Sequence, residues 1–172
     1  TLNNAVDLIN AKVESVYIGV QSFVSLVNVR DIQVIVAGNV YNPGPYVLNG
    51  NSNVFHALSI AGGPSEIGSY RSINLVRNNK TIETIDLYKT FIMGQSSFDT
   101  RLRSGDLVFV NSVSNLVNIS GGVKRPALYE LLDSDNLYKG IEFANGLNNK
   151  ADISDITLYR IINGKVADIG LT

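Results

Sequence analysis

The side chains with the greatest capacity for chemistry are few in this sequence and lie far apart. His56 is the only histidine, and cysteine is absent. Nucleophilic triads and histidine metal cages need several such groups held together, so His56 would have to act alone. Ser59 lies one helical turn from His56, which does not complete a catalytic pair. We therefore expect no catalytic residue, no metal site and no cofactor.

The acidic residues are equally scattered. No two carboxylates have a spacing that fixes them on one element for paired acid–base work. Asp152 and Asp155 lie close together, but a calcium site needs more oxygen ligands at regular spacing, so we expect them to cap a turn. Gly62 and Gly63 lack the motif of a phosphate-binding loop and indicate the end of a helix.

Composition and charge argue against a disordered chain, a nucleic-acid-binding protein and a membrane-spanning segment. The 172 residues are 45% apolar and 17% charged, which predicts one or two small folded domains rather than a disordered chain. A net charge of −1 leaves no basic surplus for binding nucleic acid. No apolar run reaches the roughly 18 residues that span a bilayer, and no signal peptide is visible. We expect Thr1 to be a cut point and any membrane anchor to lie outside this sequence.

Hydrophobic periodicity predicts one helix followed by many short strands. From Ala5 to Val20 apolar residues recur at three- and four-residue spacing, which is typical of an amphipathic helix, and a strand with period two follows over 23–29. The stretch between Tyr88 and Arg101 carries no clear pattern. The other predicted elements are a strand over 32–40, a breaker at 42–45, a strand over 46–48, a helix over 54–61, a hairpin of 73–77 with 81–87, and a strand over 107–110.

The chain contains an internal repeat. Gly38 and Gly121 are related by an offset of 83 residues, and the same offset matches residues further along without a gap. One inserted residue in the second hairpin then changes the offset to 84. The sequence therefore predicts two copies of one small unit. The matched pairs include Val40 with Val123, Pro43 with Pro126, Tyr46 with Tyr129, Asn53 with Asn136, Gly63 with Gly146 and Arg77 with Arg160.

The two copies differ at their ends. The first continues through Ser104-Gly105-Asp106 into a closing strand, whereas the second stops at Thr172, before the equivalent strand. An unpaired edge is a template for another strand. The alternatives are that the sequence is cut there, or that the lead-in or a neighbouring chain fills the edge.

Each copy orders its elements as strand, proline turn, strand, short helix, glycine turn and hairpin, which is a β-grasp arrangement. The stretch VAGNVYNPGPYVL at 36–48 resembles the opening of the soluble-ligand-binding β-grasp (SLBB) domain, and ALSIAGG at 57–63 resembles its helix end. LVR at 75–77 and LRSGDLVFV at 102–110 are similar to its later strands. The second copy departs from the pattern, with RPA at 125–127 and ANG at 144–146, which would alter any ligand site there.

Tandem copies of this domain are similar to those of bacterial outer-membrane polysaccharide-export proteins, and the lead-in resembles the helix and strand that close their export domain. The resemblance implies an α+β fold with two tandem β-grasp-like (SLBB) domains, each strand-rich with one short helix. The expected domains are residues 1–31, the end of the export domain; residues 32–111, the first SLBB domain; and residues 115–172, the second SLBB domain without its last strand.

The resemblance also implies a function. We expect a non-enzymatic scaffold or conduit, the periplasmic part of an outer-membrane-associated protein that exports capsule or exopolysaccharide. The implied partners are the polysaccharide polymer, further copies of the chain in a ring and the inner-membrane synthesis and export machinery, with no nucleic acid and membrane contact only through segments outside this sequence. The alternative is a module that recognises an oligosaccharide or another small molecule.

Tyrosines and arginines are the candidates for sugar contacts. A tyrosine ring can cover an apolar sugar face, and an arginine can hydrogen-bond to hydroxyl groups. Packing is the favoured alternative, because Tyr46 and Tyr129 hold equivalent positions in the two copies. The candidate ligand-binding residues are Tyr41, Tyr46, Tyr70, Arg71, Arg125 and Tyr129.

Overall fold

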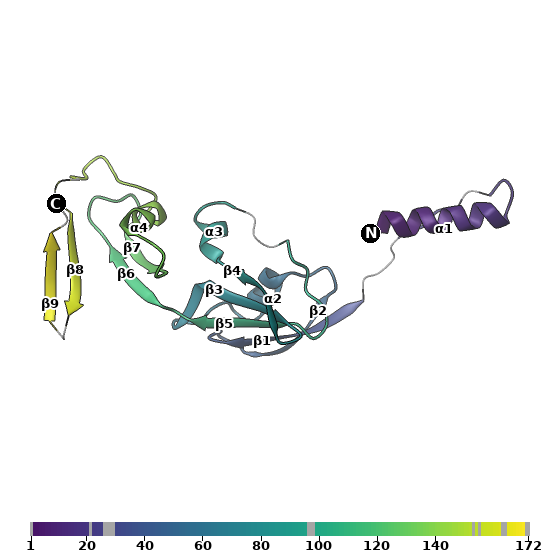
Figure 1. Ribbon diagram of the computed structural model, residues 1–172, viewed down its shortest axis with the longest axis horizontal. Coiled ribbons are helices and arrows are strands. Elements are labelled where there is room, and N and C mark those ends of the chain that lie inside the picture. The colour runs from purple at the N-terminus through teal and green to yellow at the C-terminus, as the bar shows by residue number, and fades with distance from the viewer. Residues whose placement is uncertain are drawn as a thin grey trace.

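The computed structural model describes residues 2–20, 22–25, 30–95, 99–152, 154, 156–162 and 165–170. The elements follow one another along an elongated molecule (Figure 1). Helix α1 (Leu2–Val16) lies at one end, and the hairpin of β8 (Thr157–Ile162) and β9 (Lys165–Gly170) lies at the other. The fold is α+β, with short helices lying against small sheets.

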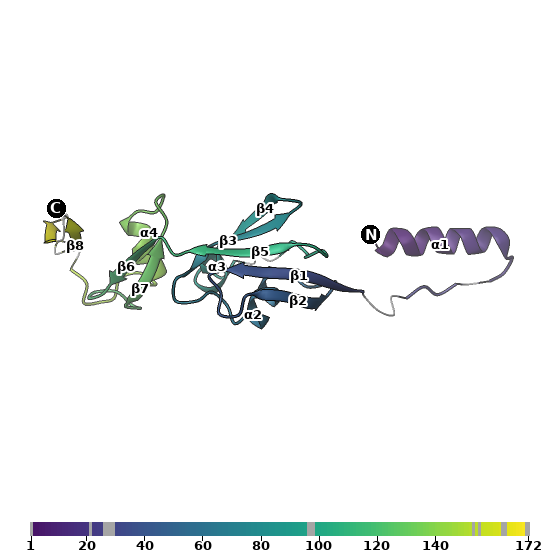
Figure 2. The ribbon, with the colours of Figure 1, turned by 90° about the horizontal axis from the view of Figure 1, so that it is seen from below.

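The first copy (residues 31–112) is built on a five-stranded sheet with the order β2-β1-β5-β3-β4. Strand β5 is the last in sequence but lies in the centre, parallel to β1 and antiparallel to β3, so it joins two hairpins into one sheet (Figure 2). Helix α2 (Val54–Ile60) contacts β1 and β5. The strands are β1 (Asp31–Gly38), β2 (Gly44–Asn49), β3 (Gly68–Arg77), β4 (Lys80–Ile85) and β5 (Leu107–Ser112), and the fully buried apolar side chains are those of Val34, Val36, Ala57, Ala61, Ile73, Leu75, Val108 and Val110.

Neighbouring residues explain where the elements of the first copy begin and turn. The Asn53 side chain accepts a hydrogen bond from the His56 amide at 3.2 Å, and His56 Nδ1 accepts one from the Asn53 amide at 3.2 Å, which together cap α2. The turn from β3 to β4 needs two residues with positive φ, and Asn78 and Asn79 adopt 50° and 58°. The predicted helix and hairpin therefore form, and His56 is an exposed capping residue.

The second copy (residues 115–170) repeats these local structures. Tyr46 Oη donates to the main-chain oxygen of Asn42 at 2.6 Å, and Tyr129 Oη donates to the main-chain oxygen of Arg125 at 2.7 Å. Asn136 accepts from the Lys139 amide at 3.0 Å, as a helix cap does. The duplication read from the sequence is thus present in the backbone as well. The elements are β6 (Asn115–Ile119), β7 (Ala127–Leu131), α4 (Leu137–Phe143), β8 and β9, and isolated bridges pair Val40 with Pro64 and Val123 with Leu147.

The sheets of the two copies differ. Among the described strands of the second copy, β6 pairs with β7 and β8 pairs with β9, and no strand joins the two pairs. In the first copy that joining strand is β5. The second copy therefore has the helix and both hairpins of the unit, but its sheet is in two parts.

Two segments differ from the sequence expectations. Residues 22–25 form no strand, because no described residue pairs with them, and the rest of the predicted strand, 26–29, lies outside the described residues. The stretch after Tyr88, which carries no clear pattern, contains the short helix α3 (Leu87–Phe91), capped by Asp86. Helix α3 packs on both copies: Leu87 lies in the core of the first copy, and Tyr88 packs against the core of the second.

Candidate functional site at the junction of the two copies

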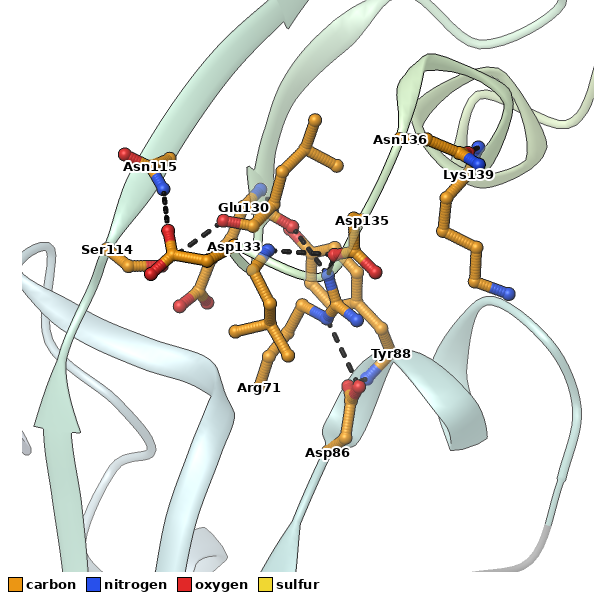
Figure 3. A network of polar contacts seen from close by, with 12 residues as sticks. Arg71, Asp86, Tyr88, Ser114, Asn115, Glu130, Asp133, Asp135, Asn136 and Lys139 are labelled. Carbon is orange, nitrogen blue, oxygen red and sulfur yellow. Dashed lines mark hydrogen bonds and ion pairs between the residues drawn. The ribbon is translucent and has the colours of Figure 1, made fainter.

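Arg71 on β3 lies at the boundary between the two copies and is only 5% exposed. Its Nε donates to Asp86 Oδ2 at 3.1 Å, and its Nη1 forms an ion pair with Asp135. Nη1 also donates to the main-chain oxygen of Glu130 at 3.1 Å. The guanidinium therefore joins the first copy to β7 and the turn after β7 in the second copy (Figure 3).

Backbone amides hold both aspartates in place. Asp86 caps α3 and accepts a hydrogen bond from the Tyr88 amide at 2.9 Å. Asp135 accepts one from the Leu132 amide at 2.7 Å, which closes the turn between β7 and α4. A carboxylate already fixed by a backbone donor loses little freedom when it pairs with arginine. Asp86 therefore holds Arg71 in place within the first copy, and the ion pair of Arg71 with Asp135 fixes the second copy against the first.

Glu130 on β7 reaches back into the first copy and is 2% exposed. Its Oε1 accepts a hydrogen bond from Ser69 Oγ at 2.6 Å, and its Oε2 accepts one from the Tyr70 amide at 2.9 Å. The Glu130 amide donates to Tyr88 Oη at 3.0 Å. Across the described residues, every buried side-chain nitrogen or oxygen has a hydrogen-bond partner, so this network is fully satisfied.

Aromatic rings from both copies enclose the guanidinium of Arg71. Its central carbon lies 4.7 Å from the ring centroid of Phe143 and 5.4 Å from that of Tyr88. These two rings meet edge to face with centroids 5.1 Å apart. Tyr88, Ile92 and Met93 all pack against the core of the second copy. The first copy therefore supplies part of the apolar core of the second.

The protonation states of the junction follow from burial and charge. Burial by itself lowers the pKa of Arg71, but the hydrogen bonds and charges of Asp135 and Asp86 outweigh it, so the pKa is raised. Burial also disfavours the charged form of Asp135, yet Arg71 and the Leu132 amide hold the pKa of Asp135 below its usual value. Burial raises the pKa of Tyr88. Each of these groups keeps one protonation state near neutral pH, which suits a structural network rather than proton transfer.

Three of the six predicted ligand residues lie at the junction or in the second copy. Arg71 is the centre of the junction. Tyr129 is 4% exposed and donates to the Arg125 oxygen, while Arg125 Nη2 donates to the Phe143 oxygen at 3.0 Å. The latter bond ties the turn between β6 and β7 to the end of α4. These contacts are those of packing, which is the favoured alternative for these side chains.

The side chains of the other three predicted residues lie in the first copy, although the Tyr70 amide donates to Glu130 in the junction network. Tyr41 is 59% exposed, Tyr70 is 42% exposed, and Tyr46 is partly buried against the first core. A ligand role for any of the six stays a prediction. Two shallow surface depressions in the described part of the chain are lined by other residues: one by Glu14, Tyr17, Ile18, Gly19 and Val20, and one of about 440 Å³ by Lys124, Asn148, Asn149 and Lys150.

Sequence reasoning missed the acidic side of the junction, Asp86, Glu130 and Asp135. Asp86 precedes an apolar run, where an acidic residue is typical of a helix cap, so its role as a cap could be predicted from the sequence. The ion pairs with Arg71 could not be predicted, because Asp86 is 15 residues and Asp135 is 64 residues away from Arg71 in the sequence. Folding of the first copy brings Asp86 to Arg71, and packing of the two copies brings Asp135 and Glu130 to it.

Neither a metal-binding cluster nor a membrane-spanning helix is found in the part of the chain that the structure describes. The described residues contain no group of three or more His, Asp or Glu side chains that could hold a metal ion. Among the same residues, no helix has the length and apolar content needed to cross a membrane.

Comparisons with known proteins match both copies to one family. The SLBB domain family matches residues 33–86 and 116–169. Two curated proteins of Escherichia coli, each named "Polysialic acid transport protein KpsD", are 29% identical to the chain over 129 residues. That stretch is 74% of this chain and 23% of each relative, so the chain spans less than a quarter of the length of the curated relatives it matches.

Proposed function

The chain belongs to the SLBB domain family, and from that premise we propose that it is a non-enzymatic scaffold segment of a bacterial polysaccharide export protein. We place it in the periplasm, in a protein associated with the outer membrane. The proposal is supported by the similarity to proteins named for polysialic acid transport and by the two family matches in tandem.

The observation that carries the proposal is the buried junction around Arg71. A hinge between modules has few buried contacts crossing it. Here an ion pair with Asp135, the buried carboxylate of Glu130 and a shared aromatic core all cross between the copies. Together they make the two copies one stiff unit, which is what the wall of a conduit or a spacer needs.

The proposed mechanism is assembly rather than catalysis. The charged groups of the junction are occupied by one another, so they hold the copies in register and leave no free acid or base there. Binding energy would come from interfaces between stiff units, with closed rings of identical chains as the symmetric solution. The polymer, further copies of the chain and inner-membrane export machinery are the proposed partners.

The experiment that tests the proposal is carried out in the source bacterium. Asp135→Asn is introduced into the complete export protein, with Asp133→Asn as the matched control. Asp133 is exposed, and its carboxylate accepts a hydrogen bond from the exposed Asn115 side chain at 2.9 Å. We expect Asp135→Asn to leave the protein present in the envelope but to lower surface polysaccharide several-fold, and the control to do neither. Hydrogen exchange would show whether Asp135→Asn loosens the junction. A loosened junction together with wild-type polysaccharide levels would contradict the proposal.

A second candidate function is recognition of an acidic saccharide, favoured by the depression lined by Lys124, Asn148, Asn149 and Lys150. Two ammonium groups can bind a carboxylate, and the Asn149 side chain can bond to a sugar hydroxyl. Asn148 shapes the depression, because its Nδ2 donates to the main-chain oxygen of Val123 at 3.0 Å and its Oδ1 accepts from the Lys150 amide at 2.8 Å. Titration with an acidic and a neutral oligosaccharide, followed by NMR, would distinguish the candidates. Saturable shifts at this depression that Lys150→Ala abolishes would support recognition, whereas shifts at Tyr41 or Tyr70 would favour the tyrosine contacts.

A further inference from the structure

The five-stranded sheet of the first copy has two faces, and helix α2 packs on one of them. On that side the buried residues of β1 and β5 include Val36 and Val108. Successive residues of a strand point to opposite faces, so the residues between the buried ones form a second face, which we call the outer face. The outer face consists of Gln33, Ile35 and Ala37 on β1, Pro45 and Val47 on β2, Asn74 and Val76 on β3, Thr84 on β4, and Leu107 and Phe109 on β5.

The centre of the outer face is apolar and exposed. Ile35 pairs with Pro45 on one side and with Leu107 on the other, and Leu107 pairs with Val76, so one apolar row crosses the sheet. Phe109 lies beside this row, and both Ile35 and Phe109 are exposed. A sheet with one face in water normally alternates apolar and polar residues, whereas strands covered on both faces are apolar throughout. The central strands of the first copy are of the second kind.

The second copy shows that the fold of the unit does not need apolar residues on this face. Asn118 on β6 is exposed and its neighbour Ile119 is buried, so the alternation there has a polar residue on the outside. The apolar outer face is therefore a property of the first copy rather than a requirement of the fold. The offset of 83 residues matches Ile35 with Asn118, Ala37 with Ser120, Val47 with Glu130 and Pro45 with Leu128.

The second copy also shows which kind of partner this face contacts. Glu130 lies on the outer face of β7, because its neighbours on both sides pack into the core of the second copy. Its carboxylate accepts hydrogen bonds from Ser69 and the Tyr70 amide, which belong to another β-grasp unit. Val47, the equivalent of Glu130, is exposed. Because the two units of this chain already pack on each other, a unit for the outer face of the first copy comes from a second molecule of the chain.

Charge and edge chemistry favour contact between two outer faces. None of the outer-face residues is charged, so two such faces can meet about a two-fold axis without opposing like charges. Gln33, Asn74 and Thr84 add polar groups to an apolar centre, as in protein interfaces. The edges of the sheet are poorer templates for association, because β2 carries Pro45 and β4 begins with Lys80.

The size of the outer face predicts a weak association. Five strands that are about 4.8 Å apart and about six residues long give a face of about 24 Å by 20 Å. Two such faces bury about 1,000 Å² in total, which is near the lower limit of a specific interface. We therefore expect an equilibrium between one and two molecules that depends on concentration.

We propose that the outer face of the first copy is a self-association surface, on which the same face of a second molecule packs about a two-fold axis. The two sheets stack as in a β-sandwich, about 10 Å apart and with strand directions about 30° from parallel. Ile35 and Phe109, on the two central strands, are buried in the contact. This inference names the surface for the self-association given under the proposed function, and it rests on that part of it.

The first test measures the mass of the chain by sedimentation equilibrium at increasing concentration. We expect a reversible dimer. Ile35→Asn introduces the residue type that the second copy has at the equivalent position, and it should raise the dissociation constant roughly tenfold or more, because the dimer contains the change twice. Ile60→Asn is the matched control, since Ile60 is 56% exposed against 48% for Ile35 and lies on α2, on the opposite side of the sheet. It should leave the dissociation constant unchanged.

Two outcomes of this measurement would overturn the proposal. One is a chain that stays monomeric up to about 1 mM. The other is a dimer that Ile60→Asn weakens and Ile35→Asn does not, which would assign the contact to the helix side. Urea unfolding of both variants shows that each is folded. The polysaccharide assay with Asp135→Asn tests a different surface, so either result can fail while the other succeeds.

A second measurement leaves the apolar residues of the outer face unchanged. The chain has no cysteine, so one spin label can be attached at Gln33→Cys on the outer face, or at Ser59→Cys on α2 as the control. Each spin-labelled chain is mixed with isotope-labelled chain, and the NMR signals then report contacts between molecules. We expect the label at residue 33 to broaden amide signals of β1 and β5, and the label at residue 59 to leave them sharp. Broadening from residue 59 alone, or from neither label, would overturn the face-to-face contact.

Discussion

The guanidinium of Arg71, in the first copy, forms an ion pair with the carboxylate of Asp135, in the turn after β7 of the second. Arg71 has a second carboxylate, Asp86, within its own copy. The side chains of Arg71 and Asp135 are 5% and 10% exposed. Solvent therefore screens the pair little, and each partner depends on the other for compensation of its charge.

Removal of one partner from this pair should destabilise the junction. Asp135→Asn takes away a charge that faces Arg71, and we expect it to lower the free energy of unfolding by about 2–4 kcal/mol. Urea unfolding followed by tyrosine fluorescence measures the change. The matched control Asp133→Asn should stay within about 0.5 kcal/mol of the unmodified chain. Equal stability of the two variants would contradict the structural role given to Asp135.

The same carboxylate predicts how stability depends on acid. The pKa of folded Asp135 lies below its usual value, so its pairing stabilises the fold at neutral pH and is lost as pH falls through the folded pKa. The loss should begin below about pH 5 and continue below about pH 4. Free energies of unfolding measured from neutral to acid pH should show a shallower slope for Asp135→Asn than for the unmodified chain. Parallel curves for the two proteins would refute this assignment.

A substitution in the core shared by the two copies should destabilise the second copy and leave the first folded. Phe143 is fully buried and touches Tyr88 from the first copy. Phe143→Ala should destabilise the second copy by about 3–5 kcal/mol through the cavity that it leaves. Hydrogen exchange should then speed up in β6 and β7 while the amides of β1 and β5 stay protected. Tyr138→Ala, at a side chain that is 80% exposed on the same helix, is the control and should leave exchange unchanged.

Substitution of alanine for the equivalent residues Arg77 and Arg160 should change the free energy of unfolding by different amounts. Arg77→Ala leaves the buried Asp106 without its bidentate partner, and we expect a loss of about 2–4 kcal/mol. Arg160→Ala at an exposed position should change the free energy of unfolding by less than about 0.5 kcal/mol. Chemical unfolding of the two variants checks this. Similar losses would mean that Arg160 already has a buried partner.

The sequence predicted most of the elements and the duplication because both are encoded by neighbouring residues. Asn53 and Asn136 lie directly ahead of apolar helical stripes, and Gly38 and Gly121 mark the same positive-φ turn. The strand expected over 23–29 was wrong for residues 23–25, because alternation alone does not supply a pairing partner. Helix α3 was missed because it is short and its apolar residues are divided between two cores, Leu87 in the first and Tyr88 against the second.

The candidate site was predicted less well than the fold. Arg71 was named for a sugar contact that stays untested, whereas the structure shows it buried between two aspartates. Nothing in the residues around Arg71 distinguishes these two environments. The exposed Tyr41 and the buried Tyr129 likewise look alike in sequence, although their exposed fractions are 59% and 4%.

By itself the sequence determined that this protein is a duplicated β-grasp unit without a histidine or cysteine cluster, since caps, turns and hydrophobic periods depend on residues a few positions apart. Only the tertiary structure decided that Arg71 joins the copies and that Glu130 reaches back to Ser69. Those outcomes depend on groups 60 or more residues apart, as for Arg71 and Asp135. Packing of whole elements, rather than local backbone preference, brings such groups together.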